Sequence, residues 1–113
     1  MIVEEIVNKL GLQVVAPGDI AQEVTGGYAA DLLSCVMAKA KAGNVWVTLQ
    51  AHPNVIAVAS LLNLAAVIVS EGMKPDLETV ERAQENRVTL LSSPHTTFAV
   101  VGQLTKLGVG GDS

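Results

Sequence analysis

The 113-residue sequence predicts a single α/β domain, with a mainly parallel sheet and helices on both faces. Two observations lead to this fold class. A unit of strand, loop, proline and helix occurs three times, and its prolines, Pro53, Pro75 and Pro94, are about twenty residues apart, as βα units suggest. Hydrophobic residues make up 50% of the chain and aromatic residues only 3%, so aliphatic side chains must fill the core. We place the domain at residues 1–108 and a flexible carboxyl-terminal tail at residues 109–113.

The first part of the chain predicts one helix and two short strands. Apolar residues at helical spacing indicate a helix over residues 2–10, and Gly11 is a suitable stop. The two strands can join the sheet at either edge, so the sequence leaves the strand order open. They are expected at residues 12–15 and 20–25, with a turn at 16–19 between them and the pair Gly26-Gly27 at the end of the second.

From residue 34 onward, predicted helices and strands alternate. Ser34 is a plausible cap for a helix through Lys41, which Gly43 ends. Proline fits the first helical turn, and strands that alternate with helices imply a parallel sheet with right-handed crossovers. The three loops then share the carboxyl edge of the sheet, where open α/β sheets bind ligands. The strands are expected at residues 45–49, 65–69 and 88–91, and the helices at 54–62, at 76–86 and from Pro94 to about 107.

Residues 55–62 of the predicted helix are apolar nearly all round, with Ser60 as the only polar residue among them. Such a helix must be covered on more than one side. Charged residues make up only 16% of the chain, against about 25% in an average soluble domain. We therefore expect a homodimer in which the partner subunit supplies the second cover.

Charge and composition argue against several classes of protein. The net charge is −4 and the seven basic residues are scattered, so we expect no nucleic-acid binding. The apolar stretch at residues 55–70 is shorter than the ~20 residues of a spanning helix, and the amino terminus does not resemble a signal peptide. We expect no membrane association. The single cysteine, Cys35, cannot form an internal disulfide, which fits a cytoplasmic protein.

Three helix starts and several hydroxyl groups are expected at the carboxyl edge, where helix N–H groups could hold an anion. A small anionic metabolite such as a nucleotide is the ligand that this arrangement favours. The candidate ligand-binding residues are Gly26, Gly27, Tyr28, Thr48, Gln50, His52, Asn54, Ser92, Ser93, His95 and Thr96.

Each of these groups also has a purely structural interpretation. The pair Gly26-Gly27 is either a plain turn or a place where backbone approaches a ligand or a partner, with Tyr28 available for stacking. Ser93 is well placed as a helix cap, which competes with an anion held by the hydroxyls around Pro94. The two histidines either bond loop backbone or donate to a ligand phosphate.

No catalytic constellation can be assembled from the sequence. The phosphate-binding pattern GxxxxGK[ST] does not occur, and the sequence places no general base and acid beside any serine. The carboxylates Glu78, Glu81 and Glu85 line one helix, which indicates a solvated face. We therefore expect no enzyme, no catalytic residue, no cofactor and no metal site.

Two stretches carry a family resemblance: VTGGYAADLLSCVMAKAKAGNVWVTLQAHPN and, after an apolar helix and strand, LLSSPHTTFAVVGQL. Together they resemble the DRTGG-domain family, in particular its small stand-alone members, over essentially the whole chain. Only Thr25-Gly26-Gly27 matches the end of the motif that names the family, so no functional residue carries over. Such domains are similar to the N-terminal domain of HPr kinase/phosphorylase, and related domains accompany CBS domains in regulated pyrophosphatases. The resemblance implies a regulatory or dimerising module.

The sequence thus leads to a non-catalytic regulatory or ligand-sensing module, dimeric, which binds a nucleotide or another small anionic metabolite. The alternative is a pure protein-interaction or dimerisation module, which the low charge and the apolar helix at residues 54–62 favour. A third hypothesis is a phosphotransferase-type enzyme, for which base, nucleophile and phosphate loop are all missing.

Overall fold

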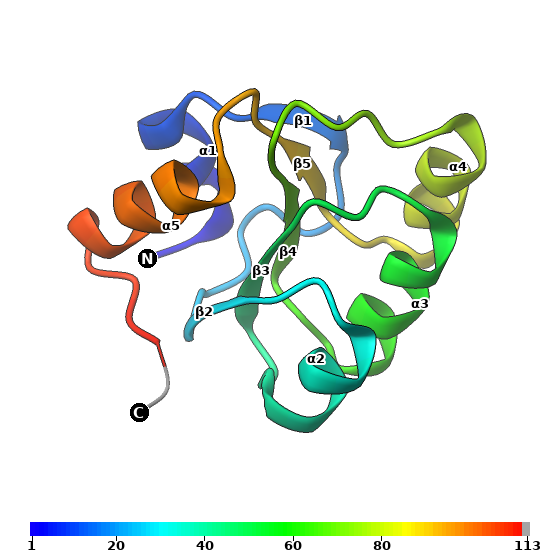
Figure 1. The fold of residues 1–113 in the computed structure, drawn as a ribbon, viewed down its shortest axis with the longest axis horizontal. Coiled ribbons are helices and arrows are strands. Elements are labelled where there is room, and N and C mark those ends of the chain that lie inside the picture. The colour runs from blue at the N-terminus through cyan, green and yellow to red at the C-terminus, as the bar shows by residue number, and fades with distance from the viewer. Residues whose placement is uncertain (112–113) are drawn as a thin grey trace.

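A computed structural model of the chain describes residues 1–111, and residues 112 and 113 of the predicted tail lie outside the described residues. Figure 1 shows a five-stranded sheet in the order β1-β5-β4-β3-β2, covered by five helices. The elements are α1 (Val3–Leu10), β1 (Gln13–Ala16), β2 (Gly26–Ala29), α2 (Leu33–Lys39), β3 (Asn44–Thr48), α3 (Pro53–Leu61), β4 (Ala66–Val69), α4 (Leu77–Asn86), β5 (Leu90–Ser92) and α5 (Thr97–Lys106).

The predicted, mainly parallel sheet is confirmed. Strands β2, β3, β4 and β5 run parallel in chain order, and β1 pairs with β5 in the antiparallel sense at one edge. The strand β1, whose place the sequence left open, therefore forms one edge of the sheet, and β2 forms the opposite edge. Because β2 to β5 follow one another in a single direction, crossovers of one hand place α2, α3 and α4 on the same face.

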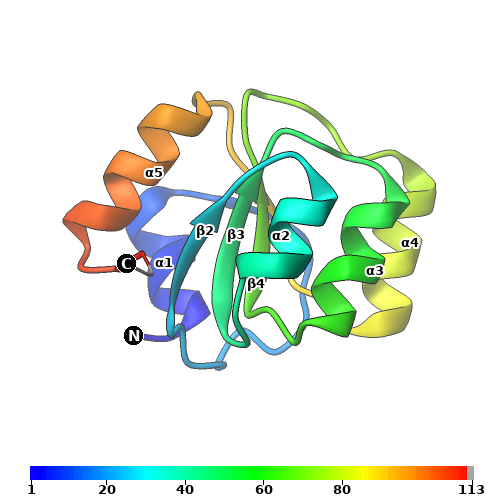
Figure 2. The ribbon, with the colours of Figure 1, turned by 60° about the horizontal axis from the view of Figure 1, so that its bottom comes forward.

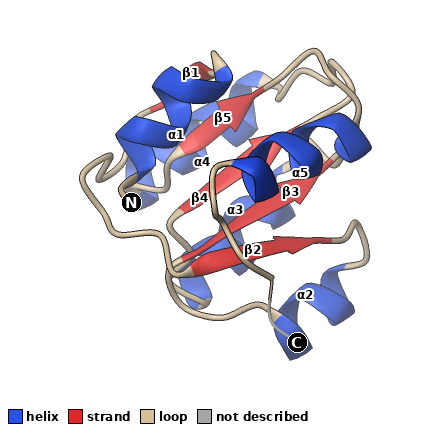
Figure 3. Cartoon of the chain, turned by 90° about the vertical axis from the view of Figure 1, so that its left-hand side faces the viewer, coloured by secondary structure: helices blue, strands red, loops and turns tan. Residues whose placement is uncertain are grey.

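Helices cover both faces, as the sequence predicts, and Figure 3 shows α1 and α5 in front of the sheet with α3 and α4 behind it. Successive side chains of a strand point to opposite faces. In β3, Trp46 therefore packs among residues of α2, α3 and α4, whereas Val45 and Val47 pack with α1 and α5. The strands β3 and β4 are buried throughout, so the core has two layers, one on each side of the sheet.

The predicted strand at residues 20–25 is wrong. That segment is a turn and a crossing connection, because Asp19 accepts from the backbone N–H groups of Ala21 and Gln22. The strand β2 instead begins at Gly26 and contains the glycine pair. Gly26 pairs in register with Asn44, so the glycines lie inside a parallel ladder and do not form a turn.

Two predicted helix caps are also wrong. The helix α2 begins one residue before Ser34, and its N-cap residue Leu32 makes no side-chain cap bond. The helix α5 begins at Thr97, where Thr96 accepts from the Ala99 N–H at 3.1 Å, so Ser93 lies outside the helix. Of the three prolines, only Pro53 occupies the first helical turn.

The helix α3 is covered within the chain. Its apolar residues Val55, Ile56, Val58 and Ala59 are buried, and the helix packs between α2 and α4. Two neighbouring helices and the sheet therefore supply the cover that we had expected from a partner subunit. The apolar helix therefore gives no reason to expect a partner subunit, and the homodimer stays a prediction.

The first residues of the predicted tail pack on the domain. Val109 is buried in the core layer of α1 and α5, and Gly110 accepts from the Gly27 N–H at 2.8 Å. Gly111 forms a parallel bridge with Gly27, which extends the ladder past β2. Among residues 1–111, no helix is long and apolar enough to span a membrane.

Candidate ligand site at the carboxyl edge of the sheet

The loops that follow β2, β3, β4 and β5 gather along one edge of the sheet, the upper rim in Figure 2. At one point on this edge the chain leaves neighbouring strands in opposite directions. After β4 it continues into α4 on one face, and after β5 it continues into α5 on the other face. Ligands of open α/β sheets bind in the crevice at such a point.

A cavity of about 370 Å³ lies beside this crevice. It is bounded by the loop after β4, the loop after β5 and the chain around the start of β1. Of the described residues that line it, Lys74 is the only charged one, and its exposed ammonium forms no ion pair within residues 1–111. The lining residues are Gly11, Gln13, Gly72, Met73, Lys74, Ser92, Ser93 and Pro94.

Two serines line this cavity, and hydrogen bonds hold one of them, Ser93, firmly in place. Ser93 is buried, its N–H donates to Val69 O at 2.9 Å, and its Oγ accepts from the His95 N–H at 3.1 Å. The Ser93 carbonyl accepts from Gly72 N at 3.1 Å, so the loops after β4 and β5 are joined. Ser92 Oγ lies 3.5 Å from Gln13 Oε1, at the limit of a hydrogen bond, and remains available to another acceptor.

The amino end of α5, where we expected an anion, already holds a carboxylate. Glu71 Oε2 accepts from the Thr97 N–H at 2.6 Å, and the Ser70 and Thr97 hydroxyls lie 2.6 Å apart. The Glu71 N–H in turn donates to His95 O at 2.7 Å. A second anion at this helix end would face the Glu71 carboxylate, so the loops favour a ligand in the neighbouring cavity.

The predicted residues after β3 form a separate group. Thr48 is buried, its hydroxyl donates to Asp31 Oδ1 at 2.9 Å, and it accepts from the Gln50 N–H at 3.1 Å. Gln50 Oε1 is buried without a hydrogen-bond partner among residues 1–111. His52 and Asn54 are exposed. Because β4 lies between β3 and β5, this group is two strand spacings, or about 10 Å across the sheet, from Ser92 and Ser93.

Asp76 caps α4 at the same edge. Its carboxylate accepts from the backbone N–H of Thr79 at 2.8 Å and from the Thr79 hydroxyl at 2.7 Å. The bond from the Thr79 backbone, aided by that hydroxyl and by nearby His52, holds the pKa of Asp76 below its ordinary value. Asp31, Glu71 and Asp76 thus all accept from backbone N–H groups of the edge. Within residues 1–111, no three His, Cys, Asp or Glu side chains are grouped to hold a metal ion.

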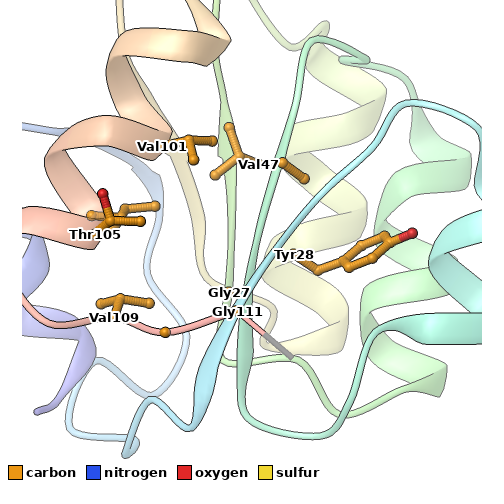
Figure 4. Close-up of a pocket in the computed structure, with 10 residues that line it drawn as sticks. Gly27, Tyr28, Val47, Val101, Thr105, Val109 and Gly111 are labelled. Atoms are coloured by element: carbon orange, nitrogen blue, oxygen red, sulfur yellow. The ribbon is translucent and has the colours of Figure 1, made fainter. Parts of the chain in front are cut away.

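The structure does not bring the glycine pair to this edge. Gly26 pairs with Asn44, four residues before Thr48, which is about 13 Å along the strand. Gly27 faces a small apolar cavity of about 90 Å³ between β2 and α5. Figure 4 shows Tyr28 directed away from Val47 on the other side of β2, where its ring packs on the core layer of α2 to α4.

Of the predicted site residues, only Ser92 and Ser93 line the large cavity, and His95 and Thr96 lie in the adjoining loop. The predicted set did not include the other six lining residues: Gly11, Gln13, Gly72, Met73, Lys74 and Pro94. A signal for Lys74 was present, because it is the only lysine or arginine in the loops that follow β2 to β5.

Comparison with known proteins identifies the family of the chain. The model of the DRTGG domain matches residues 5–107, so the chain belongs to the DRTGG domain family. No curated protein sequence matches the chain.

One solved structure with the same fold is that of the CBS and DRTGG domains of the regulatory region of Clostridium perfringens pyrophosphatase, complexed with its activator diadenosine tetraphosphate. The TM-score is 0.70 at 16% sequence identity, and the match covers 90% of this chain. The chain spans less than half, 45%, of the length of that structure.

Proposed function

We propose that the chain is a non-catalytic regulatory module that binds a nucleotide or another small phosphorylated metabolite in the Lys74 cavity, defined by the eight lining residues given above. The observation that carries this proposal is a cavity of about 370 Å³ in which, among residues 1–111, a lysine is the only charged lining residue. Small-molecule sites have volumes of roughly 300–1,000 Å³, so the cavity suits a small ligand. The neighbouring hydroxyls of Ser92 and Ser93 can donate to phosphate oxygens.

The family supports a regulatory role. A DRTGG domain occurs in the regulatory region of a pyrophosphatase whose structure contains a nucleotide activator. That relation is one of fold, so the ligand of this chain has to be found by experiment.

The use of the carboxylates supports a non-catalytic role. Asp31, Glu71 and Asp76 accept hydrogen bonds from backbone N–H groups of the carboxyl-edge loops, at 2.9, 2.6 and 2.8 Å. A general acid or base needs a carboxyl group that can reach a substrate proton. Here the three carboxylates hold loops in place.

A thermal-shift screen tests the proposal with inorganic phosphate and with nucleoside mono-, di- and triphosphates. A ligand at a hundred times its dissociation constant adds about 2.7 kcal/mol to the free energy of unfolding. For a domain of this size that raises the unfolding midpoint by about 10 °C or more. We expect one class of phosphate compound to give such a shift.

The variant Lys74→Ala then locates the site. It should weaken binding of the identified compound by about tenfold or more, because one charge-assisted contact is lost. The matched control is Lys39→Ala, which removes an exposed lysine at the carboxyl end of α2 and should leave affinity unchanged. Equal affinity in both variants removes the Lys74 cavity from consideration, and no shift with any compound contradicts the ligand-sensing role.

A further inference from the structure

The carboxyl edge also exposes large apolar side chains. Residues 1–111 contain nine exposed large hydrophobic residues, and five of them lie in or next to the loops of this edge. These five form what we call the apolar rim: Leu32, 63% exposed; Leu49, 39%; Met73, 47%; Leu77, 72%; and Phe98, 89%. The loops after β2 to β5 lie side by side in Figure 2, so the backbone of these five residues belongs to one edge of the sheet.

Phe98 is the clearest member of the rim. It is the only phenylalanine of the chain, and it is almost fully exposed in the first turn of α5. Burial of such a large apolar side chain releases free energy that stabilises a fold or a complex. Its position on the surface leaves that free energy available to a binding partner.

The rim is held in place by hydrogen bonds between loops. Asp31 accepts from the Leu49 N–H at 2.9 Å, which joins the loops that carry Leu32 and Leu49. The Thr79 hydroxyl, which donates to Asp76 Oδ1, also lies 3.0 Å from Ala51 O, so the start of α4 contacts the loop after β3. Glu71 accepts from the Thr97 N–H beside Phe98. A partner therefore meets a surface that is already ordered, which lowers the entropic cost of binding.

The charges around the rim indicate the chemistry of the partner. Three carboxylates lie in its loops, from Asp31, Glu71 and Asp76, against the single cation of Lys74. Glu78, in the first turn of α4, is paired with Arg82 at 3.5 Å. A second copy of the chain would place these three carboxylates opposite the same three carboxylates, which is unfavourable. A partner with lysine or arginine beside apolar side chains would match both features.

The exposed area gives the scale of the partner. Large side chains bury about 150–250 Å² each, so the rim at these exposures presents on the order of 500 Å². A standard interface takes about 800 Å² from each protein, so the rim suits a segment more than a whole second domain.

We propose that the apolar rim docks another protein through a basic amphipathic segment. Apolar side chains of the segment pack on Phe98 and Leu77, and its lysine or arginine side chains face the surrounding carboxylates. This docking surface does not depend on ligand binding in the Lys74 cavity, although Met73 belongs to both.

The experiment uses a fluorescent helical peptide of leucine and lysine and a second peptide in which glutamate replaces lysine. Fluorescence anisotropy measures their binding to the full chain and to the variant Phe98→Ala/Leu77→Ala. The matched control is Leu61→Ala, because Leu61 is 67% exposed but ends α3 at the opposite edge. We expect the double variant to bind the lysine peptide at least tenfold more weakly, and Leu61→Ala to bind it like the wild type.

Two further results are expected. An increase in salt from about 50 mM to about 500 mM weakens binding of the lysine peptide, because the Debye length falls and the attraction between its lysines and the carboxylates of the rim is screened. Lys74→Ala keeps peptide binding, which separates this surface from the ligand site. The proposal is overturned by an absence of lysine-peptide binding, by equal binding of both peptides, or by equal binding to wild type and double variant. A wild-type dimer in sedimentation that the double variant dissociates would also overturn it, since the rim then joins two copies.

Discussion

The two ends of the parallel strands are built differently. At the amino edge, where β2 to β5 begin, Gly18 and Gly26 let backbone segments lie against each other. At the carboxyl edge, side chains join the loops, and a cavity and an apolar surface lie between these loops. A Cβ on Gly18 would lie 2.8 Å from Thr89 N, and one on Gly26 would lie 2.9 Å from Gly110 O. The carboxyl edge has instead the carboxylates of Asp31, Glu71 and Asp76 on backbone N–H groups.

The difference separates residues that build the domain from residues that are free to bind. The glycine pair Gly26-Gly27 serves the chain itself, since Gly27 N–H donates to Gly110 O and the carboxyl-terminal segment extends the sheet there. The exposed Lys74 and Phe98 contribute little to the core and lie where helices diverge from the sheet. Substitutions at the amino edge should therefore affect stability, and substitutions at the carboxyl edge should affect binding.

The largest effect is expected for Gly18→Ala. Its methyl group would contact Thr89 N and Thr89 Oγ1 at 2.8 Å and displace the Gly18 N–H from Thr89 Oγ1. Overpacking of this kind costs about 1–3 kcal/mol, and we expect the upper end because backbone atoms are involved. Urea denaturation measures the change, and a loss below about 0.5 kcal/mol would show that the turn can move aside.

Gly26→Ala should have a smaller effect. The new Cβ would meet Gly110 O at 2.9 Å and Asn44 Nδ2 at 3.3 Å, but the carboxyl-terminal segment can shift. We expect a loss of about 1–2 kcal/mol in urea denaturation.

The matched control is Gly102→Ala in α5, where nothing lies within 4 Å of the added methyl group. Alanine is the better helix former, so this variant should gain about 0.5–1 kcal/mol. The same change in stability for Gly26→Ala and Gly102→Ala would contradict a close approach at the amino edge.

Asp76→Asn should change the pH dependence of stability at the carboxyl edge. The Thr79 N–H holds the pKa of Asp76 below its ordinary, unfolded value, so the charged cap stabilises the folded chain above that value. This contribution is lost as the pH falls through the lowered folded pKa. Asparagine keeps the cap but does not titrate.

Thermal unfolding between about pH 7 and pH 2 measures this effect. The midpoint of the wild type should fall more steeply below about pH 4 than that of Asp76→Asn. Glu81→Gln, which replaces another exposed carboxylate of α4, is the control and should follow the wild type. Parallel curves for Asp76→Asn and wild type would show that the cap does not contribute.

Phe98→Ala should have the smallest effect on stability. The side chain is 89% exposed, and exposed substitutions usually stay within about 0.5 kcal/mol. Urea denaturation should give a wild-type midpoint for this variant. A loss above about 1 kcal/mol would mean that Phe98 supports the fold, and would weaken its assignment to a docking surface.

The sequence predicted the regular part of the fold well. The helix expected at residues 54–62 is α3 (Pro53–Leu61), and the strand expected at 45–49 is β3 (Asn44–Thr48). In these units the apolar pattern and the positions of the prolines are local signals, so they can be interpreted without knowledge of the tertiary structure. The class of sheet and the covering of both faces follow from their alternation.

The parts that sequence reasoning missed depend on contacts between distant segments. Gly26 and Gly27 lie inside a strand because they pair with Asn44 and Val45 of β3, and the backbone at residues 110–111 packs on their other side. Glu71 occupies the amino end of α5, and no local pattern pairs residue 71 with Thr97. The residues predicted for the site therefore lie at both edges of the sheet, and the site proposed from the structure is the Lys74 cavity.

Amide chemical-shift mapping tests the difference between the two edges most directly. The ¹⁵N-labelled chain is titrated with the phosphate compound that gives the largest thermal shift. We predict that the amides of Gly72, Met73, Lys74 and Ser93 move together with one dissociation constant, while those of Gly26 and Gly27 stay in place. Movement centred on the glycine pair, or no movement with any compound of the screen, would contradict a ligand site at the carboxyl edge.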